Sequence, residues 1–136
     1  MQTIDDITGQ IVDAALKIHQ SIGPGLLESV YEVMLARELE KRGLKVQRQL
    51  VVPFEFDGQK YDDGLRLDLL VADKIIVELK SVEKIAEVHP KQLLTYLRLM
   101  KLRIGLLINF GSPTLKDGLK RVINGYEPPA IASASI

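Results

Sequence analysis

Apolar residues recur every three or four positions through the first third of the chain, a period that predicts amphipathic helices. The first helix spans residues 3–21 and ends before Gly23-Pro24-Gly25, a strong helix breaker. The second spans residues 26–42, and Gly43 can take the left-handed conformation that often ends a helix. His19 lies near the end of the first helix, and we expect it on the surface.

The middle of the chain alternates between apolar and polar residues, as half-buried strands do. A first strand is predicted over residues 44–56. The turn signal Asp57-Gly58 then predicts a hairpin whose second strand covers residues 59–71. The sequence Asp62-Asp63-Gly64 predicts a loop that interrupts this second strand.

The last third returns to helix and then to a buried strand. Residues 90–101 form a predicted helix, and Pro90 suits its first turn. The continuous apolar run at residues 104–110 predicts a strand parallel to the one at residues 75–80, reached by a right-handed crossover. Thr114 can cap a last helix over residues 115–123.

Charged residues interrupt the apolar strands on either side of the turn at residues 72–74. If this turn has three residues, Asp68 lies opposite Glu78, and Arg66 lies opposite Lys80. A two-residue turn would instead place the two carboxylates on opposite faces. The three-residue turn leaves one face apolar, with Leu67, Leu69, Val77 and Leu79.

Two adjacent carboxylates repel each other, and a proton or a cation relieves the repulsion. Mg²⁺ binds one or two protein carboxylates together with water and substrate phosphate. Lys80, on the same face as Glu78, can then hold or activate an attacking water. The alternative is a structural ion-pair cluster of Arg66, Asp68, Glu78 and Lys80.

Three separated motifs resemble one known group of proteins. Asp68 followed by Glu78-Leu79-Lys80 resembles the D…ExK signature of the PD-(D/E)XK nuclease superfamily, with Leu67 where the superfamily's name has Pro. The stretch at residues 25–31, GLLESVY, resembles the motif that names the GxxExxY family within this superfamily. Gln92 and Tyr96 resemble the QxxxY motif of its exonuclease branch.

The resemblance implies an α/β fold with a restriction-endonuclease-like αβββαβ core, a mixed sheet flanked by helices, and an extra N-terminal helix. It implies a nuclease that uses Mg²⁺ or Mn²⁺ to hydrolyse nucleic acid.

The roles that the resemblance implies fall on seven residues. Asp68, Glu78, the Leu79 carbonyl and Glu28 would bind the metal, the last directly or through water. Lys80 would orient or deprotonate the attacking water. Gln92 and Tyr96 would contact the substrate or brace Lys80. A glutamate in a first helical turn, such as Glu28, also commonly serves only to stabilise the helix dipole.

Composition limits the remaining possibilities. The chain has 136 residues, 46% of them hydrophobic, so we expect one domain over residues 1–126 and a flexible tail at 127–136. It has no cysteine, no signal-peptide pattern and no apolar run that could span a bilayer, which together predict a cytoplasmic protein.

Charge leaves a second function open. The 18 Lys and Arg residues balance the 18 Asp and Glu residues, which counts mildly against a non-specific nucleic-acid binder. A catalytically silent module of nuclease ancestry that binds nucleic acid or protein is therefore the alternative function. The small size also suggests a homodimer or a protein partner.

Overall fold

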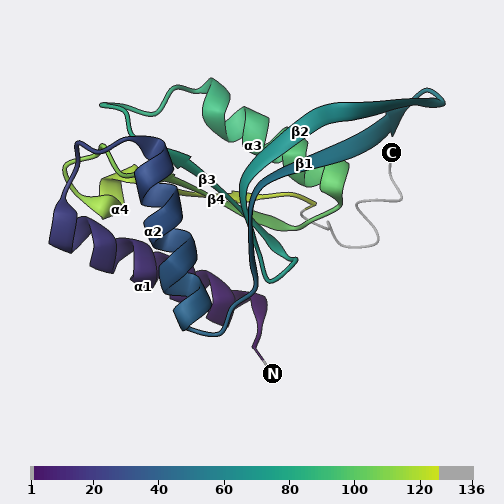
Figure 1. Ribbon diagram of the computed structural model, residues 1–136. Coiled ribbons are helices and arrows are strands. Elements are labelled where there is room, and N and C mark those ends of the chain that lie inside the picture. Colours follow the sequence, from purple (N-terminus) through teal and green to yellow (C-terminus); the bar gives the residue numbers. More distant parts are fainter. Residues whose placement is uncertain (1, 126–136) are drawn as a thin grey trace, which may run out of the picture.

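The structure is a computed structural model in which residues 2–125 are described. A mixed five-stranded sheet in the order β1-β2-β3-β4-β5 lies between helices (Figure 1). The helices are α1 (Ile4–Ile22), α2 (Glu28–Lys41), α3 (Val88–Met100) and the short α4 (Leu115–Gly118). The strands are β1 (Val46–Phe56), β2 (Gln59–Val71), β3 (Ile75–Lys80), β4 (Ile104–Asn109) and β5 (Leu119–Ile123). The expected tail at residues 127–136 lies outside the described part.

The sheet combines an antiparallel hairpin with a parallel crossover. β2 pairs antiparallel with β1 and with β3, β3 and β4 are parallel, and β5 returns antiparallel to β4. α3 makes the β3 to β4 connection that parallel strands require. The elements from α2 to β4 form the expected αβββαβ core, and α1 is the expected additional helix.

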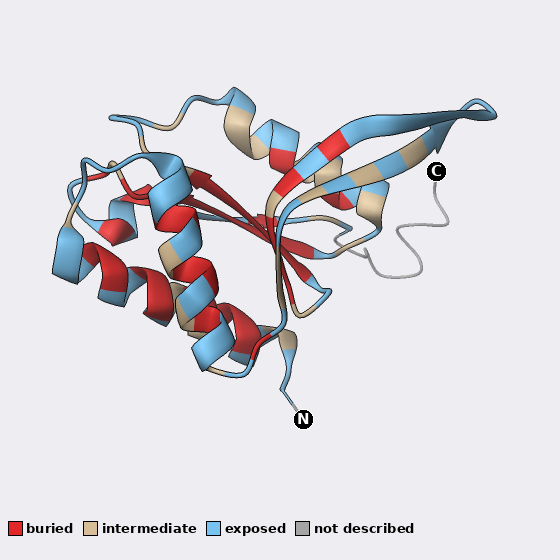
Figure 2. Cartoon of the chain, viewed as in Figure 1, coloured by how far each residue is buried: buried red, intermediate tan, exposed pale blue. Residues whose placement is uncertain are grey.

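Helices cover both faces of the central strands (Figure 2). α1 and α2 bury one face, where the Tyr31 and Phe110 rings stack with centroids 4.4 Å apart. α3 covers the other face through Leu93 and Leu97. β3 and β4 are therefore apolar on both sides, as strands covered by two helical layers must be. No helix within residues 2–125 is long and apolar enough to cross a membrane.

The segment at residues 115–123 was predicted wrongly as a helix. Thr114 does cap a helical turn by accepting a hydrogen bond from the Asp117 amide, but the helix ends at Gly118. Residues 119–123 instead form β5 along the free edge of β4. Pairing satisfies backbone groups of β4 that would otherwise lack partners.

The predicted loop at residues 62–64 is also wrong, because β2 runs through it without interruption. Gly64 lies directly against the Phe54 ring, which fills the space that a Cβ would need. The rings of Phe54 and Tyr61 stack across the hairpin with centroids 5.2 Å apart. The glycine thus accommodates an aromatic neighbour rather than breaking the strand.

His19 is buried, contrary to the surface position expected. Its Nε2 lies 2.9 Å from the Ser112 carbonyl oxygen, and its ring lies 6.4 Å from that of Phe110. The loop after β4 folds over the last turn of α1 and covers the imidazole.

Asn109 fixes the segment that follows β3. Its Oδ1 accepts hydrogen bonds from the Val82 and Gly111 amides, and its Nδ2 donates to the Val82 carbonyl oxygen at 2.9 Å. Gly111 packs so closely on Val82 that an added Cβ would lie 2.7 Å from the Val82 nitrogen. This clamp holds the chain immediately beyond Lys80.

Gly111→Ala is expected to destabilise the protein, because the Val82 backbone, held by Asn109, must move to admit the new methyl group. Overpacking of this kind costs about 1–3 kcal/mol. Gly9→Ala is the matched control: it lies in α1 with no neighbour near its Cβ position, and it should gain up to about 1 kcal/mol. Urea unfolding of both variants measures the difference. Equal stabilities for the two would contradict the clamp.

Candidate functional site

The site lies where the β2–β3 ladder ends. The three-residue turn at 72–74 is present, Val71 pairs with Ile75, and the last paired residues are Leu69 and Val77. Beyond them, side chains replace backbone pairing. The Asp68 amide donates to Glu78 Oε2 at 2.8 Å, and the Leu79 amide donates to Asp68 Oδ2 at 2.8 Å. The expected juxtaposition of Asp68 and Glu78 is confirmed.

Each carboxylate therefore has one oxygen fixed by an amide of the opposite strand. The second oxygen of Asp68, Oδ1, lies 3.4 Å from Gln49 Nε2, which is long for a hydrogen bond. No hydrogen bond within residues 2–125 engages the second oxygen of Glu78, Oε1. Both side chains are held in place while each keeps an oxygen available.

The electrostatics of the pair disfavour two negative charges. Glu78 is 6% exposed, and burial, followed by the charge of Asp68, raises its pKa to about 8. The Asp68 amide and the charge of Lys80 lower this pKa, and the charge of Glu32 raises it. The ionised pair thus needs a nearby positive charge.

Lys80 and Tyr96 complete the surroundings of the pair. Lys80 is half-buried at the end of β3 and forms no ion pair within the described part of the chain. Tyr96 is half-buried on α3, and its pKa is raised by burial and then by the charges of Glu78 and Asp68. Gln92, one turn earlier, is exposed. Within residues 2–125 it forms no hydrogen bond with Asp68 or Glu78.

From α2, Glu32 is linked to the pair through Gln49, which contacts both Glu32 and Asp68. Glu28 is exposed and lines a shallow hollow beside Ser81. Glu32, one turn later, is 4% exposed, and its Oε2 accepts a hydrogen bond from Arg48 at 3.1 Å. Gln49 Nε2 donates to Glu32 Oε1 at 2.6 Å. Sequence reasoning missed Glu32, although a charged residue beside Tyr31 on the packing face of α2 was a usable signal.

Two expectations about the hairpin are corrected. Arg66 does not lie opposite Lys80, because the β2–β3 ladder stops first; Arg66 pairs with Val51 of β1. Leu67 packs with Leu70 beneath α3 and not with Leu69 on the opposite face. The change of face occurs at position 68, where the neighbouring strand has an irregular backbone at Gln49.

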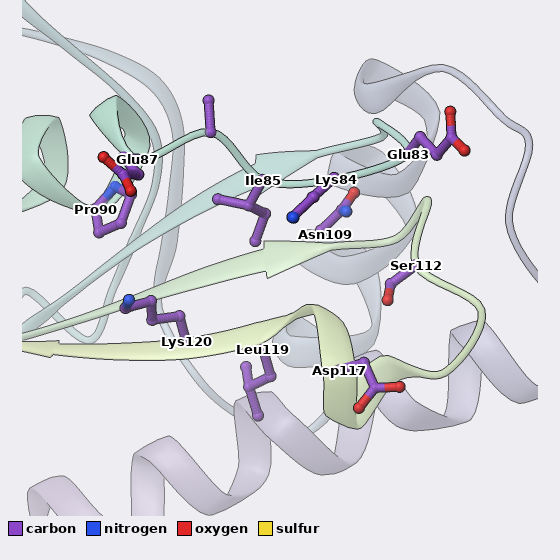
Figure 3. Close-up of a pocket in the computed structure, with 11 residues that line it drawn as sticks. Glu83, Lys84, Ile85, Glu87, Pro90, Asn109, Ser112, Asp117, Leu119 and Lys120 are labelled. Atoms are coloured by element: carbon purple, nitrogen blue, oxygen red, sulfur yellow. The ribbon is translucent and has the colours of Figure 1, made fainter.

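A cavity of about 450 Å³ lies beside Asn109, the last residue of β4. It lies between the loop after β3 and the segment from α4 to β5, and Asn109, the β4 partner of Lys80, lines it. Lys84 points inward from the loop, whereas Glu83 points away (Figure 3).

The donor groups fit a hard divalent cation. Within residues 2–125, no group of three or more His, Cys, Asp or Glu side chains is arranged to hold a metal ion by itself. Mg²⁺ does not require such a cage, because it commonly takes one or two carboxylates and completes its shell with water and phosphate. Asp68 Oδ1 and Glu78 Oε1 match that requirement.

Comparisons with known proteins bear on this geometry. The family model described as the PD-(D/E)XK nuclease superfamily matches residues 5–122. A solved structure described as the crystal structure of SSO0001 is 18% identical over 93% of this chain and 81% of that chain, with a TM-score of 0.42. A search of curated proteins gave no match.

The raised pKa of Glu78 predicts how stability depends on pH in the metal-free protein. The unfolded carboxyl ionises near its ordinary pKa of 4.5, whereas burial and Asp68 raise the pKa of the folded one to about 8. Stability in EDTA should therefore fall as the pH rises from about 5 to about 8. Glu78→Gln, which stays neutral and can still accept the Asp68 amide, should remove most of this slope. Thermal unfolding at several pH values tests this, and an unchanged slope in Glu78→Gln would refute the assignment.

Proposed function

This chain belongs to the PD-(D/E)XK nuclease superfamily, and we propose that it is a nuclease that uses Mg²⁺ or Mn²⁺ to hydrolyse phosphodiester bonds of nucleic acid. Within the superfamily we place it in the GxxExxY family, on the motif at residues 25–31. The observation that carries the proposal is the carboxylate pair of Asp68 and Glu78, in which each side chain is fixed through one oxygen and offers the other.

Asp68 and Glu78 would hold the cation, with the Leu79 carbonyl as a further oxygen ligand. Glu28 would contribute directly or through water from the start of α2. The bound cation would neutralise the pair and the charge that develops on the scissile phosphate. Because Asp68 and Glu78 are anchored by backbone amides, their free oxygens are held in fixed positions before substrate arrives.

Lys80 would orient the attacking water or take its proton, since it follows Glu78 on the same face of β3. Tyr96 faces the pair from α3 and would contact the substrate backbone, and Gln92 would do so one turn away.

The wider setting is part of the same proposal. We place the protein in the cytoplasm, on the absence of cysteine from the sequence. A single domain over residues 1–126 presents little surface for grasping a duplex, so a second copy or a protein partner would extend the contact.

One observation favours the catalytically silent alternative. The formal net charge is zero, and a module that grips nucleic acid electrostatically is usually basic. In that case nucleic acid or protein would bind in EDTA, and substitutions at Asp68 would leave binding unchanged.

Asp68→Asn and Lys80→Ala are expected to abolish cleavage while the protein remains folded. Asn keeps an oxygen that can accept the Leu79 amide, so loss of activity would reflect the lost charge. Loss of the group that handles the proton should cost at least about 10²-fold in rate. Labelled single-stranded DNA, duplex DNA and RNA with Mg²⁺ or Mn²⁺ provide the assay.

Lys74→Ala is the matched control for that assay, because Lys74 is exposed in the turn at 72–74, away from the ladder end. It should keep full activity. Undiminished cleavage by Asp68→Asn would refute the proposed mechanism, and metal-independent binding without cleavage would establish the silent module.

Glu28→Gln and Glu32→Gln should separate the two glutamates of α2. Glu28→Gln should weaken Mn²⁺ binding, measured by calorimetry, without changing stability, because Glu28 is exposed. Glu32→Gln should lower the free energy of unfolding by about 2 kcal/mol, because Arg48 loses its charged partner. Unchanged Mn²⁺ affinity in Glu28→Gln would remove Glu28 from the ligand set.

A further inference from the structure

Gln49 occupies an unusual position beside the carboxylate pair. Its φ is 49°, and within residues 2–125 it is the one non-glycine residue with positive φ inside a strand; the others lie in turns or at a helix end. Such backbone conformations are costly and concentrate at functional sites. The pairing of Gln49 with Asp68 is also missing from the β1–β2 ladder, although Arg48 and Leu50 on either side are paired.

The side chain of Gln49 reaches two carboxylates from this position. Its amide nitrogen lies between two carboxylates, 2.6 Å from Glu32 Oε1 and 3.4 Å from Asp68 Oδ1. One amide nitrogen, which carries two N–H groups, thus stands between the negative charges of α2 and β2. The two contacts are unequal: the first is short and the second is long enough to be given up easily.

The oxygen that Gln49 reaches on Asp68 is the one that a cation would use. Asp68 Oδ2 is fixed by the Leu79 amide at 2.8 Å, so Oδ1 is the free oxygen. Glu32 would keep both of its hydrogen bonds when the long contact to Asp68 breaks. Arg48 donates to Glu32 Oε2 at 3.1 Å, and Gln49 would still donate to Glu32 Oε1.

We propose that Gln49 is a positioning residue that takes the place of a cation in the metal-free protein and competes with it for Asp68. This inference rests on the proposed function, because it assumes that Asp68 and Glu78 bind a divalent cation. The partial positive charge of the Gln49 amide reduces the repulsion between Glu32 and Asp68. When Mg²⁺ or Mn²⁺ binds, the contact with Asp68 Oδ1 breaks and the contact with Glu32 is kept.

Competition between Gln49 and the cation predicts the direction in which removal of the Gln49 amide changes cation affinity. Removal of the amide leaves Asp68 Oδ1 and Glu32 Oε1 without their shared donor, so the negative potential at the site becomes stronger and cation affinity rises. If Gln49 instead held Glu32 in place as a supporting group for the cation, removal would lower the affinity. The direction of the change therefore separates the two roles.

The experiment is calorimetric titration of Mn²⁺, and separately Mg²⁺, into wild type, Gln49→Ala and Gln49→Glu. Because hydrogen bonds to charged groups contribute modestly, we expect Gln49→Ala to bind Mn²⁺ about tenfold more tightly, and Gln49→Glu at least as tightly. Gln47→Ala is the matched control, on the same strand and paired with Leu70 in a regular part of the ladder, and its affinity should equal that of wild type.

A second measurement follows the amide directly. In ¹⁵N-edited spectra of the full chain, the side-chain NH₂ signals of Gln49 should shift on addition of Mg²⁺, while those of Gln47 should not. This readout holds even if the variants at position 49 are less stable.

The outcomes distinguish this inference from the proposed function. Unchanged or weaker Mn²⁺ binding by Gln49→Ala, with wild-type binding intact and abolished by Asp68→Asn, would overturn the role of Gln49 alone. Binding that appears only in the position 49 variants would support the competition. Absence of cation binding in every variant would overturn both proposals.

Discussion

The exchange of hydrogen bonds between Asp68 and Glu78 is the interaction on which the site depends. A regular ladder would use the Asp68 and Leu79 amides for backbone pairing, but each carboxylate takes an amide of the other strand instead. The strands can therefore separate at this point while these two amides keep hydrogen-bond partners. The opening leaves one oxygen of each acid without a backbone partner, while the register of the hairpin, set further down by Val71 and Ile75, stays fixed.

Packing around the pair offsets the free-energy cost of holding two carboxyl groups side by side in the sheet. A carboxyl as buried as Glu78 is expensive to ionise, and Asp68 beside it adds to the cost. β3 nevertheless stays in place because it is covered on both faces, by α1 and α2 through Val77 and by α3 through Ile76. A strand exposed on one face would have more freedom to move the acids apart.

Sequence reasoning succeeded where a local rule decides the structure. The length of the turn at 72–74 fixed the register, and with it the meeting of Asp68 and Glu78. It failed where distant partners decide. Residues 119–123 are compatible with helix or strand, and only the free edge of β4 selects the strand. His19 is buried by a loop nearly a hundred positions away, and Glu32 gains its place from Arg48 on another element. Such contacts leave no periodicity along the chain.

The groups of the site differ in how firmly they are held, and this difference follows from their elements. Asp68 and Glu78 are fixed by strand amides, and the chain beyond Lys80 is fixed by the buried Asn109. Gln49, by contrast, lies on the edge strand β1. Its backbone has a positive φ, and its side chain reaches toward Asp68. As an edge strand, β1 has a neighbouring strand on one side only, whereas β2 and β3 are paired on both sides. The long, adjustable contact of the site therefore comes from an edge strand, while the acids that must stay in place lie on strands paired on both sides.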